Sequence, residues 1–151
     1  MPPMIRKMRC SDLAPLTALR HVAFFDDGKH TQQADVTALA KLIDGDSFEA
    51  GFVAEVDGEL AGSCLFVREE IEPLHDVSPW LAGLVVAEPH RGRGLGSALV
   101  ETVEKHARSV GCDELYLYTD AAEALYAKLG WAVAERMIAD GQPLVLMKRE
   151  L

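Results

Sequence analysis

The segment that most constrains the fold of this chain runs over residues 80–110. An apolar run, Trp80–Val86, precedes the glycine-rich sequence Arg91-Gly92-Arg93-Gly94-Leu95-Gly96, which leads into apolar residues at helical spacing. This order predicts a strand, a tight turn and a helix. Alternate glycines allow a sharp turn with several N–H groups on one side, and the helix adds its unpaired N–H groups and the positive end of its dipole. The segment therefore predicts a site for a phosphate or pyrophosphate.

Short strands are predicted on both sides of this segment. Asp57-Gly58 and Asp140-Gly141 each lie between strand-like runs, which is the strongest short signal for a β-hairpin. The predicted strands are residues 4–9, 51–56, 60–67, 80–86, 114–118, 132–138 and 143–148. Four helices are predicted: one after Ser11-Asp12 as N-cap, one from Thr31 to near Gly45, one over residues 95–110, and one over residues 121–129 capped by Asp120. We therefore expect one α+β domain over residues 1–151.

Two other phosphate-binding turns fit the segment poorly. A Walker A loop needs GxxxxGK[ST], and no lysine follows these glycines at that spacing. A dinucleotide-binding turn needs GxGxxG inside a repeating βαβ unit. The spacing here is GxGxG, and the surrounding elements are predicted hairpins.

Arg91, Gly94 and Gly96 fill the pattern R/Q-x-x-G-x-G/A at a strand-to-helix turn. At this point the chain resembles the GNAT superfamily of acyl-coenzyme A dependent N-acetyltransferases. Residues 124–131, ALYAKLGW, resemble the C-terminal LYxxLG[FW] block of the same family. The resemblance implies a GNAT-like fold, with a mixed, mostly antiparallel sheet of six to seven strands, about four flanking helices, and a splay between the fourth and fifth strands.

The resemblance also implies where acetyl-CoA, the acyl donor and co-substrate, binds. The pantetheine arm pairs with the backbone of the central strand, and the pyrophosphate lies on the N–H groups of the glycine turn. The thioester carbonyl is expected near Val86, where a bulge frees an N–H to stabilise the oxyanion. Arg91 and Arg93 either neutralise the phosphates or face solvent. The expected coenzyme-binding residues are Leu84, Val85, Val86, Arg91, Gly92, Arg93, Gly94, Leu95, Gly96, Ser97 and Tyr126.

The expected catalytic residues are Tyr126 and Val86. Tyr126 occupies the tyrosine position of the family and is the expected general acid, because a phenol with a pKa of about 10 matches a thiol leaving group. The alternative is that its ring packs the short helix against the sheet. The base is left open, since the central strand contains no carboxylate. Its candidates, each of which could equally be a solvated charge, are Glu70, Glu72, His75, Asp76 and Asp120.

The acceptor pocket is expected at the loop between the first two helices, which in the family helps to wall it. Aromatic and carboxylate side chains there suit a cationic amine through cation–π contact and charge pairing. The expected substrate-binding residues are Phe24, Phe25, Asp26, Asp27, His75 and Asp76. The alternative is that the two phenylalanines pack in the core and the aspartates are solvated.

Composition excludes several other classes of function. The formal net charge of −9 disfavours nucleic acid as a partner. The scattered cysteines and the lack of an HxxxH spacing predict no metal site. Without a membrane-spanning run or a signal peptide, we expect a cytoplasmic protein with no membrane partner. The expected partner is a small-molecule or peptide amine, and the terminal hairpin could pair two copies into a homodimer.

Two hypotheses of different classes follow. The first is an enzyme that moves an acetyl group from acetyl-CoA to a primary amine by direct attack in a ternary complex. The second is a GNAT-fold module that binds an acyl-coenzyme A as a sensor without turnover. Both predict coenzyme binding, and only the first predicts amine-dependent release of a free thiol.

Overall fold

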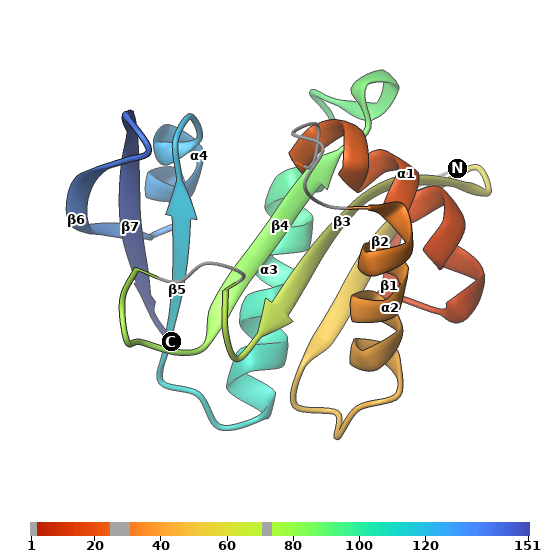
Figure 1. Ribbon diagram of the computed structural model, residues 1–151, viewed down its shortest axis with the longest axis horizontal. Coiled ribbons are helices and arrows are strands. Elements are labelled where there is room, and N and C mark those ends of the chain that lie inside the picture. The colour runs from red at the N-terminus through yellow and green to blue at the C-terminus, as the bar shows by residue number, and fades with distance from the viewer. Residues whose placement is uncertain (1–2, 25–30, 71–73) are drawn as a thin grey trace.

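The computed structural model describes residues 3–24, 31–70 and 74–151. Its strands form one sheet in the order β1-β2-β3-β4-β5-β7-β6, in which β4 and β5 are parallel and the other neighbours are antiparallel (Figure 1). The strands are β1 Met4–Lys7, β2 Ala50–Val56, β3 Glu59–Val67, β4 Trp80–Val86, β5 Glu114–Thr119, β6 Ala132–Ala139 and β7 Gln142–Glu150. The predicted α+β class and the mostly antiparallel mixed sheet are confirmed.

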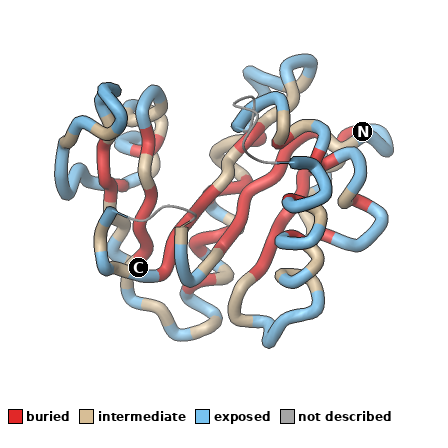
Figure 2. Tube along the Cα trace, viewed as in Figure 1, coloured by how far each residue is buried: buried red, intermediate tan, exposed pale blue. Residues whose placement is uncertain are grey.

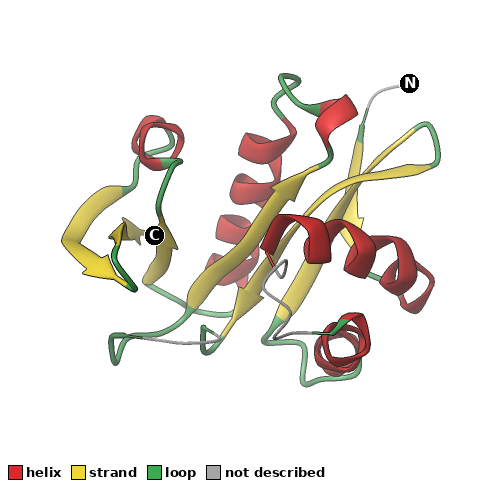
Figure 3. Ribbon diagram, turned by 45° about the horizontal axis from the view of Figure 1, so that its top comes forward, coloured by secondary structure: helices red, strands yellow, loops and turns green. Residues whose placement is uncertain are grey.

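Helices cover both faces of the sheet. The helices are α1 Leu13–Phe24, α2 Gln32–Ile43, α3 Leu95–Ser109 and α4 Glu123–Lys128, with short 3-10 turns at Cys10–Asp12 and Glu88–His90. In Figure 3, α3 lies on one side of β2–β4, and α1 and α2 lie on the other. The β5, β7 and β6 half of the sheet carries α4 at one end.

Alternation along the strands divides the core into two layers. Phe66 is fully buried with Leu99 in the cluster on the α3 side. Its neighbour Leu65 points to the opposite face, where it packs with Leu39 of α2. This is the two-residue period expected of strands that are covered on both faces, and Figure 2 shows the burial concentrated along the central strands.

The predicted splay between β4 and β5 is present. The two strands are paired at one position, Trp80 with Tyr116, where the Tyr116 N–H donates to the Pro79 carbonyl at 3.1 Å. From there the strands diverge toward Val86 and Thr119 (Figure 1). The divergence leaves the far half of β4 without a neighbour on its β5 side.

Both predicted hairpins are confirmed, and their turns explain the signal. Asp57 and Gly58 have φ values of 51° and 80°, and Asp140 and Gly141 have values of 50° and 77°. Two consecutive positive φ values define the type I′ turn that Asp-Gly pairs favour.

The helix starts were predicted less well. Ser11 and Asp12 lie in the 3-10 turn, where the Asp12 carboxylate accepts the Arg9 N–H at 2.7 Å and pairs with Arg6, so it does not cap α1. Asp120 does not cap α4, because the Thr119 hydroxyl takes the Ala122 N–H at 3.0 Å. The second helix was predicted to begin at Thr31, and Thr31 is the N-cap of α2, with its hydroxyl accepting the Ala34 N–H at 3.0 Å.

Among the described residues, no helix is long and apolar enough to cross a membrane.

Candidate active site

The glycine-rich turn presents backbone N–H groups at the start of α3. Gly92 and Gly94 have φ values of 80° and 78°, which L side chains rarely adopt. Gly94 is the N-cap of α3, and no side chain caps the helix there. The N–H groups of Leu95, Gly96 and Ser97 precede the first intrahelical bond, which runs from Ala98 N–H to the Gly94 carbonyl at 3.1 Å. The local geometry is therefore that of an anion site built from backbone.

The two arginines of the turn are exposed. Arg91 Nε donates a hydrogen bond to the Val86 carbonyl at 3.0 Å, so the guanidinium lies against the end of β4. Arg91 therefore sits between the glycine turn and the unpaired edge of the strand.

The end of β4 offers backbone groups toward the space left by β5. Ala87 N–H donates to the Ala61 carbonyl of β3 at 2.7 Å, and Val85 lies opposite Ser63. Because the polar groups alternate in direction along a strand, the N–H and carbonyl of Val86 point away from β3. An extended ligand could pair with Val86 as an added strand would.

A bulge interrupts β4 two residues before this edge. Ser63 pairs with Val85 and Leu65 pairs with Ala82, so Gly83 and Leu84 together lie opposite Cys64. Gly83 has a φ of 64°, as expected for glycine in such a bulge. The bulge frees backbone groups at Gly83 and Leu84. It therefore lies two to three residues before Val86, near which the bulge and its oxyanion-stabilising N–H were expected.

A cavity of about 270 Å³, here named the strand-gap cavity, lies between β4 and β5. The β4 bulge and Tyr126 both line it. Tyr126 is 6% exposed, packs edge-on against Trp131, and has a pKa raised well above its usual value by burial. Tyr126 therefore keeps its proton at neutral pH, and it is a weaker acid than the unshifted phenol that was expected to match a thiol leaving group.

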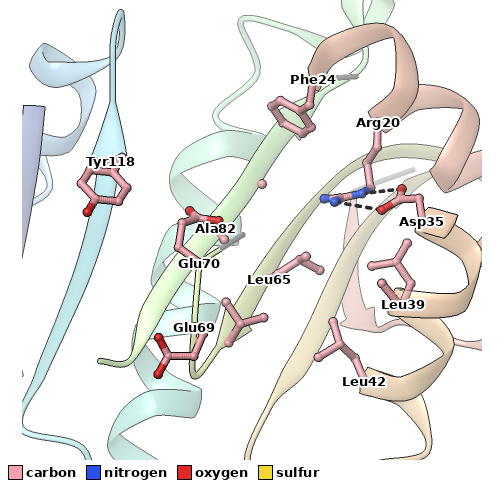
Figure 4. A pocket seen from close by; sticks show the side chains of 13 residues that line it. Arg20, Phe24, Asp35, Leu39, Leu42, Leu65, Glu69, Glu70, Ala82 and Tyr118 are labelled. Atoms are coloured by element: carbon pink, nitrogen blue, oxygen red, sulfur yellow. Dashed lines mark hydrogen bonds and ion pairs between the residues drawn. The ribbon is translucent and has the colours of Figure 1, made fainter. Parts of the chain in front are cut away.

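A larger cavity of about 440 Å³, here named the helix-side cavity, lies between α1, α2 and the β3–β4 face of the sheet. Arg20 of α1 and Asp35 of α2 form a buried ion pair in its wall (Figure 4). Arg20 Nε and Nη2 donate to the two Asp35 oxygens at 2.9 and 3.2 Å. A Cβ placed on Gly83 would lie 2.5 Å from Arg20 Nη1, so the guanidinium packs directly against the bulge.

The two cavities meet at the bulge. Both are lined by Phe24, Glu70, Ala82, Gly83 and Tyr118. A ligand in the strand gap and a second ligand beneath the helices would therefore approach each other at Gly83. Two ligands bound in these cavities would come into contact with each other at the bulge.

The structure separates the five candidates for the base. Glu70 lines both cavities, and Asp120 lines the strand-gap cavity. His75 and Asp76 line neither cavity, and Glu72 lies outside the described residues. The His75 ring is held elsewhere, with Nδ1 2.7 Å from the Tyr118 hydroxyl and Nε2 2.9 Å from a Glu135 oxygen. The expectation that His75 and Asp76 contact the substrate therefore finds no support in this geometry.

Of the expected acceptor residues on the first loop, Phe24 is described and the other three are not. Phe24 is the last residue of α1, is 42% exposed, and lies with its ring 5.6 Å from Arg20 Cζ. It lines both cavities rather than packing in the core. Phe25, Asp26 and Asp27, which are also expected to bind the substrate, lie outside the described residues.

Sequence reasoning missed the buried pair of Arg20 and Asp35, together with the role of Gly83. A glycine inside a strand is a signal for a bulge, so Gly83 could have been found. The ion pair joins residues of two different helices that are 15 positions apart in the chain, and no local sequence pattern marks it. Among the described residues, no group of three or more His, Cys, Asp or Glu side chains forms a metal site.

Comparison with known proteins adds sequence and fold relationships. Residues 13–131 match the Acetyltransferase (GNAT) family. N-acetyltransferase 8 of Mus musculus is 32% identical over 106 residues, which cover 68% of this chain and 45% of that protein. The chain spans less than half the length of the first curated relatives that it matches.

Solved structures share the fold along nearly the whole chain. A ribosomal-protein-alanine N-acetyltransferase from Brucella melitensis has a TM-score of 0.81 at 22% identity, with 98% of this chain and 99% of that chain covered. A putative acetyltransferase from Salmonella typhimurium, solved with its cofactor acetyl-CoA, has a TM-score of 0.79 at 20% identity, with 100% of this chain and 95% of that chain covered. These likenesses show a shared fold, and the family match over residues 13–131, which is well over half of the chain, shows that the chain belongs to the GNAT acetyltransferase family.

Proposed function

We propose that this protein transfers the acetyl group of acetyl-CoA to a primary amine by direct attack in a ternary complex. The observation that carries the proposal is the meeting of two cavities at the Gly83 bulge, one beside the unpaired edge of β4 and one beneath α1 and α2. The strand-gap cavity would hold the pantetheine arm and thioester, and the helix-side cavity would hold the amine.

The donor side supplies backbone contacts for the coenzyme. The pyrophosphate would rest on the turn from Arg91 to Ser97, where two glycines have positive φ and the start of α3 has no side-chain cap. The pantetheine would pair with Val86, whose carbonyl now accepts from Arg91, so the guanidinium would turn toward the phosphates. We place the oxyanion donor at the Gly83–Leu84 bulge, which adjoins both cavities.

The chemistry then needs a neutral amine and a proton for the leaving thiolate. The amine nitrogen attacks the thioester carbonyl, the carbon–sulfur bond breaks, and an amide and free coenzyme A form. Tyr126 would protonate the thiolate, because it lines the strand-gap cavity and carries the proton that the thiolate needs. Glu70 would accept the proton from the amine, directly or through a water, because it is the base candidate that borders both cavities.

The test is release of free thiol from acetyl-CoA in the presence of a panel of primary amines. We expect release that depends on the amine and exceeds the rate without it. If calorimetry shows that coenzyme A binds but no amine in a broad panel is acetylated, the proposal fails, and a non-catalytic acyl-coenzyme A binding module is the better interpretation.

A further inference from the structure

The helix-side cavity has a definite polarity. Leu39 and Leu42 of α2 form one side, and Leu65 lies at the centre of the wall. Figure 4 shows Glu69 and Glu70 on the other side, toward β4 and β5. The cavity is therefore acidic at the end that meets the strand gap and apolar at the end beneath α2.

The ion pair in the wall does not alter this polarity. Arg20 and Asp35 are 4% and 8% exposed, and their opposite charges compensate each other through two hydrogen bonds. Among the described lining residues, Asp35 is the acidic residue at the α2 end, and its charge is balanced by Arg20. An ammonium placed there would lose its hydration without gaining a carboxylate of its own, which is strongly unfavourable.

From this polarity we infer that the acceptor is a small primary amine with an apolar body and no second cationic group at its far end. The inference rests on the proposed function, because it places the reacting nitrogen at Gly83. The ammonium is drawn to the glutamate end, loses a proton and faces the thioester, while an aliphatic or aromatic tail lies against Leu42 and Leu65. The volume of about 440 Å³ is within the range of roughly 300 to 1,000 Å³ found for small-molecule sites.

The test compares three amines that differ in one property at a time: ethylamine, hexylamine and 1,6-diaminohexane. We expect kcat/KM to rise about 4-fold per added methylene until the cavity is full, which corresponds to about 0.8 kcal/mol for each buried methylene. The diamine has the length of hexylamine and a second ammonium at the far end. We expect its kcat/KM to be at least about 10-fold below that of hexylamine, because the second charge would be buried unpaired.

A pair of variants locates the effect in the cavity. Leu42→Gln replaces a half-buried leucine by a side chain of similar size, and it makes the cavity end beneath α2 polar. We expect about a 10-fold loss of kcat/KM for hexylamine and little change for ethylamine. Leu19→Gln is the matched control, since Leu19 is a half-buried leucine of α1 outside this cavity.

Three results would overturn the inference while leaving the proposed function intact: the diamine outperforms hexylamine, a short peptide with a free α-amine outperforms hexylamine, or Leu42→Gln leaves the chain-length dependence unchanged. If no amine releases thiol, the proposed function fails instead. Calorimetry of hexylamine and ethylamine with the coenzyme A-loaded protein then tests the inference directly. Equal affinities would contradict it, and tighter binding of hexylamine would support it.

Discussion

The proposed donor side and the helix-side cavity are built in different ways. The donor side uses backbone groups from one continuous segment, the β4 edge and the glycine turn before α3, with Tyr126 added from α4. The helix-side cavity uses side chains from α1, α2, β3, the segment after β3, β4 and β5. Backbone recognition depends on local conformation, whereas side-chain recognition depends on which elements the fold brings together.

This comparison predicts that variants on the two sides separate into two kinetic classes. Changes at the junction or the helix-side cavity should affect turnover or the amine, and should leave coenzyme affinity intact. Changes at the glycine turn should weaken the coenzyme and spare the amine. The predictions below run from the largest expected effect to the smallest.

Glu70→Gln tests the acceptor side of the junction. Glutamine keeps the shape of the side chain and cannot accept a proton, so we expect kcat to fall about 100-fold or more with the affinity for coenzyme A unchanged. Steady-state kinetics and calorimetry measure the two quantities. Glu69→Gln is the control, because Glu69 lines only the helix-side cavity of the two, and its loss should be smaller. Equal losses for both variants would remove Glu70 from the mechanism.

Tyr126→Phe tests the donor side of the junction. The ring and its edge contact with Trp131 are retained and the proton is lost, so we expect kcat to fall about 10- to 100-fold at constant coenzyme affinity. Turnover of the best amine reports the effect, and the thermal midpoint checks the fold. Wild-type turnover in a folded variant would mean that the tyrosine only packs α4 against the sheet.

Gly94→Val tests the turn itself. Its φ of 78° is strained for a β-branched residue although no atom lies within 4 Å of the added Cβ, so the turn must change shape. We expect the affinity for coenzyme A to fall about 10-fold or more, measured by calorimetry. Gly141→Val places the same residue at a φ of 77° in the β6–β7 turn, also without contacts, and should leave that affinity unchanged. A folded Gly94→Val protein with normal affinity would refute the phosphate site.

Arg91→Gln should have the mildest effect. Arg91 is exposed and its contribution to phosphate binding is a screened surface interaction, so we expect coenzyme affinity to fall about 3-fold, with a smaller difference at high salt. Affinities at two ionic strengths measure this. A loss larger than that of Gly94→Val would reverse the comparison and make side chains the main phosphate ligands.

The sequence predicted the fold and the strand–turn–helix unit over β4 and α3 well, for a common physical reason. Asp-Gly pairs fix a turn type, alternate glycines fix a helix start, and apolar periodicity fixes which face is buried, and all of these act between near neighbours. Helix boundaries were predicted less well because capping groups compete. Asp12 is taken by Arg6 and Arg9, and Thr119 rather than Asp120 binds the first N–H of the α4 region.

The candidates for the general base show more clearly what local sequence patterns cannot predict. Glu70, His75 and Asp76 lie in one segment of seven residues, and the local sequence does not show which of them could reach the amine. The structure holds His75 between Tyr118 and Glu135, residues 43 and 60 positions away, and leaves Glu70 at the junction of the cavities. Contacts at such separations leave no local pattern.

By itself, the amino-acid sequence determined the strand–turn–helix unit, the hairpins and the acyl-coenzyme A family, because each is set by residues close together in the chain. Only the tertiary structure decided where the bulge lies in β4, how Arg20 and Asp35 pack against it, and which end of the helix-side cavity is acidic. Those features depend on which side chains meet across helices and strands, and that is settled when the whole core packs at once.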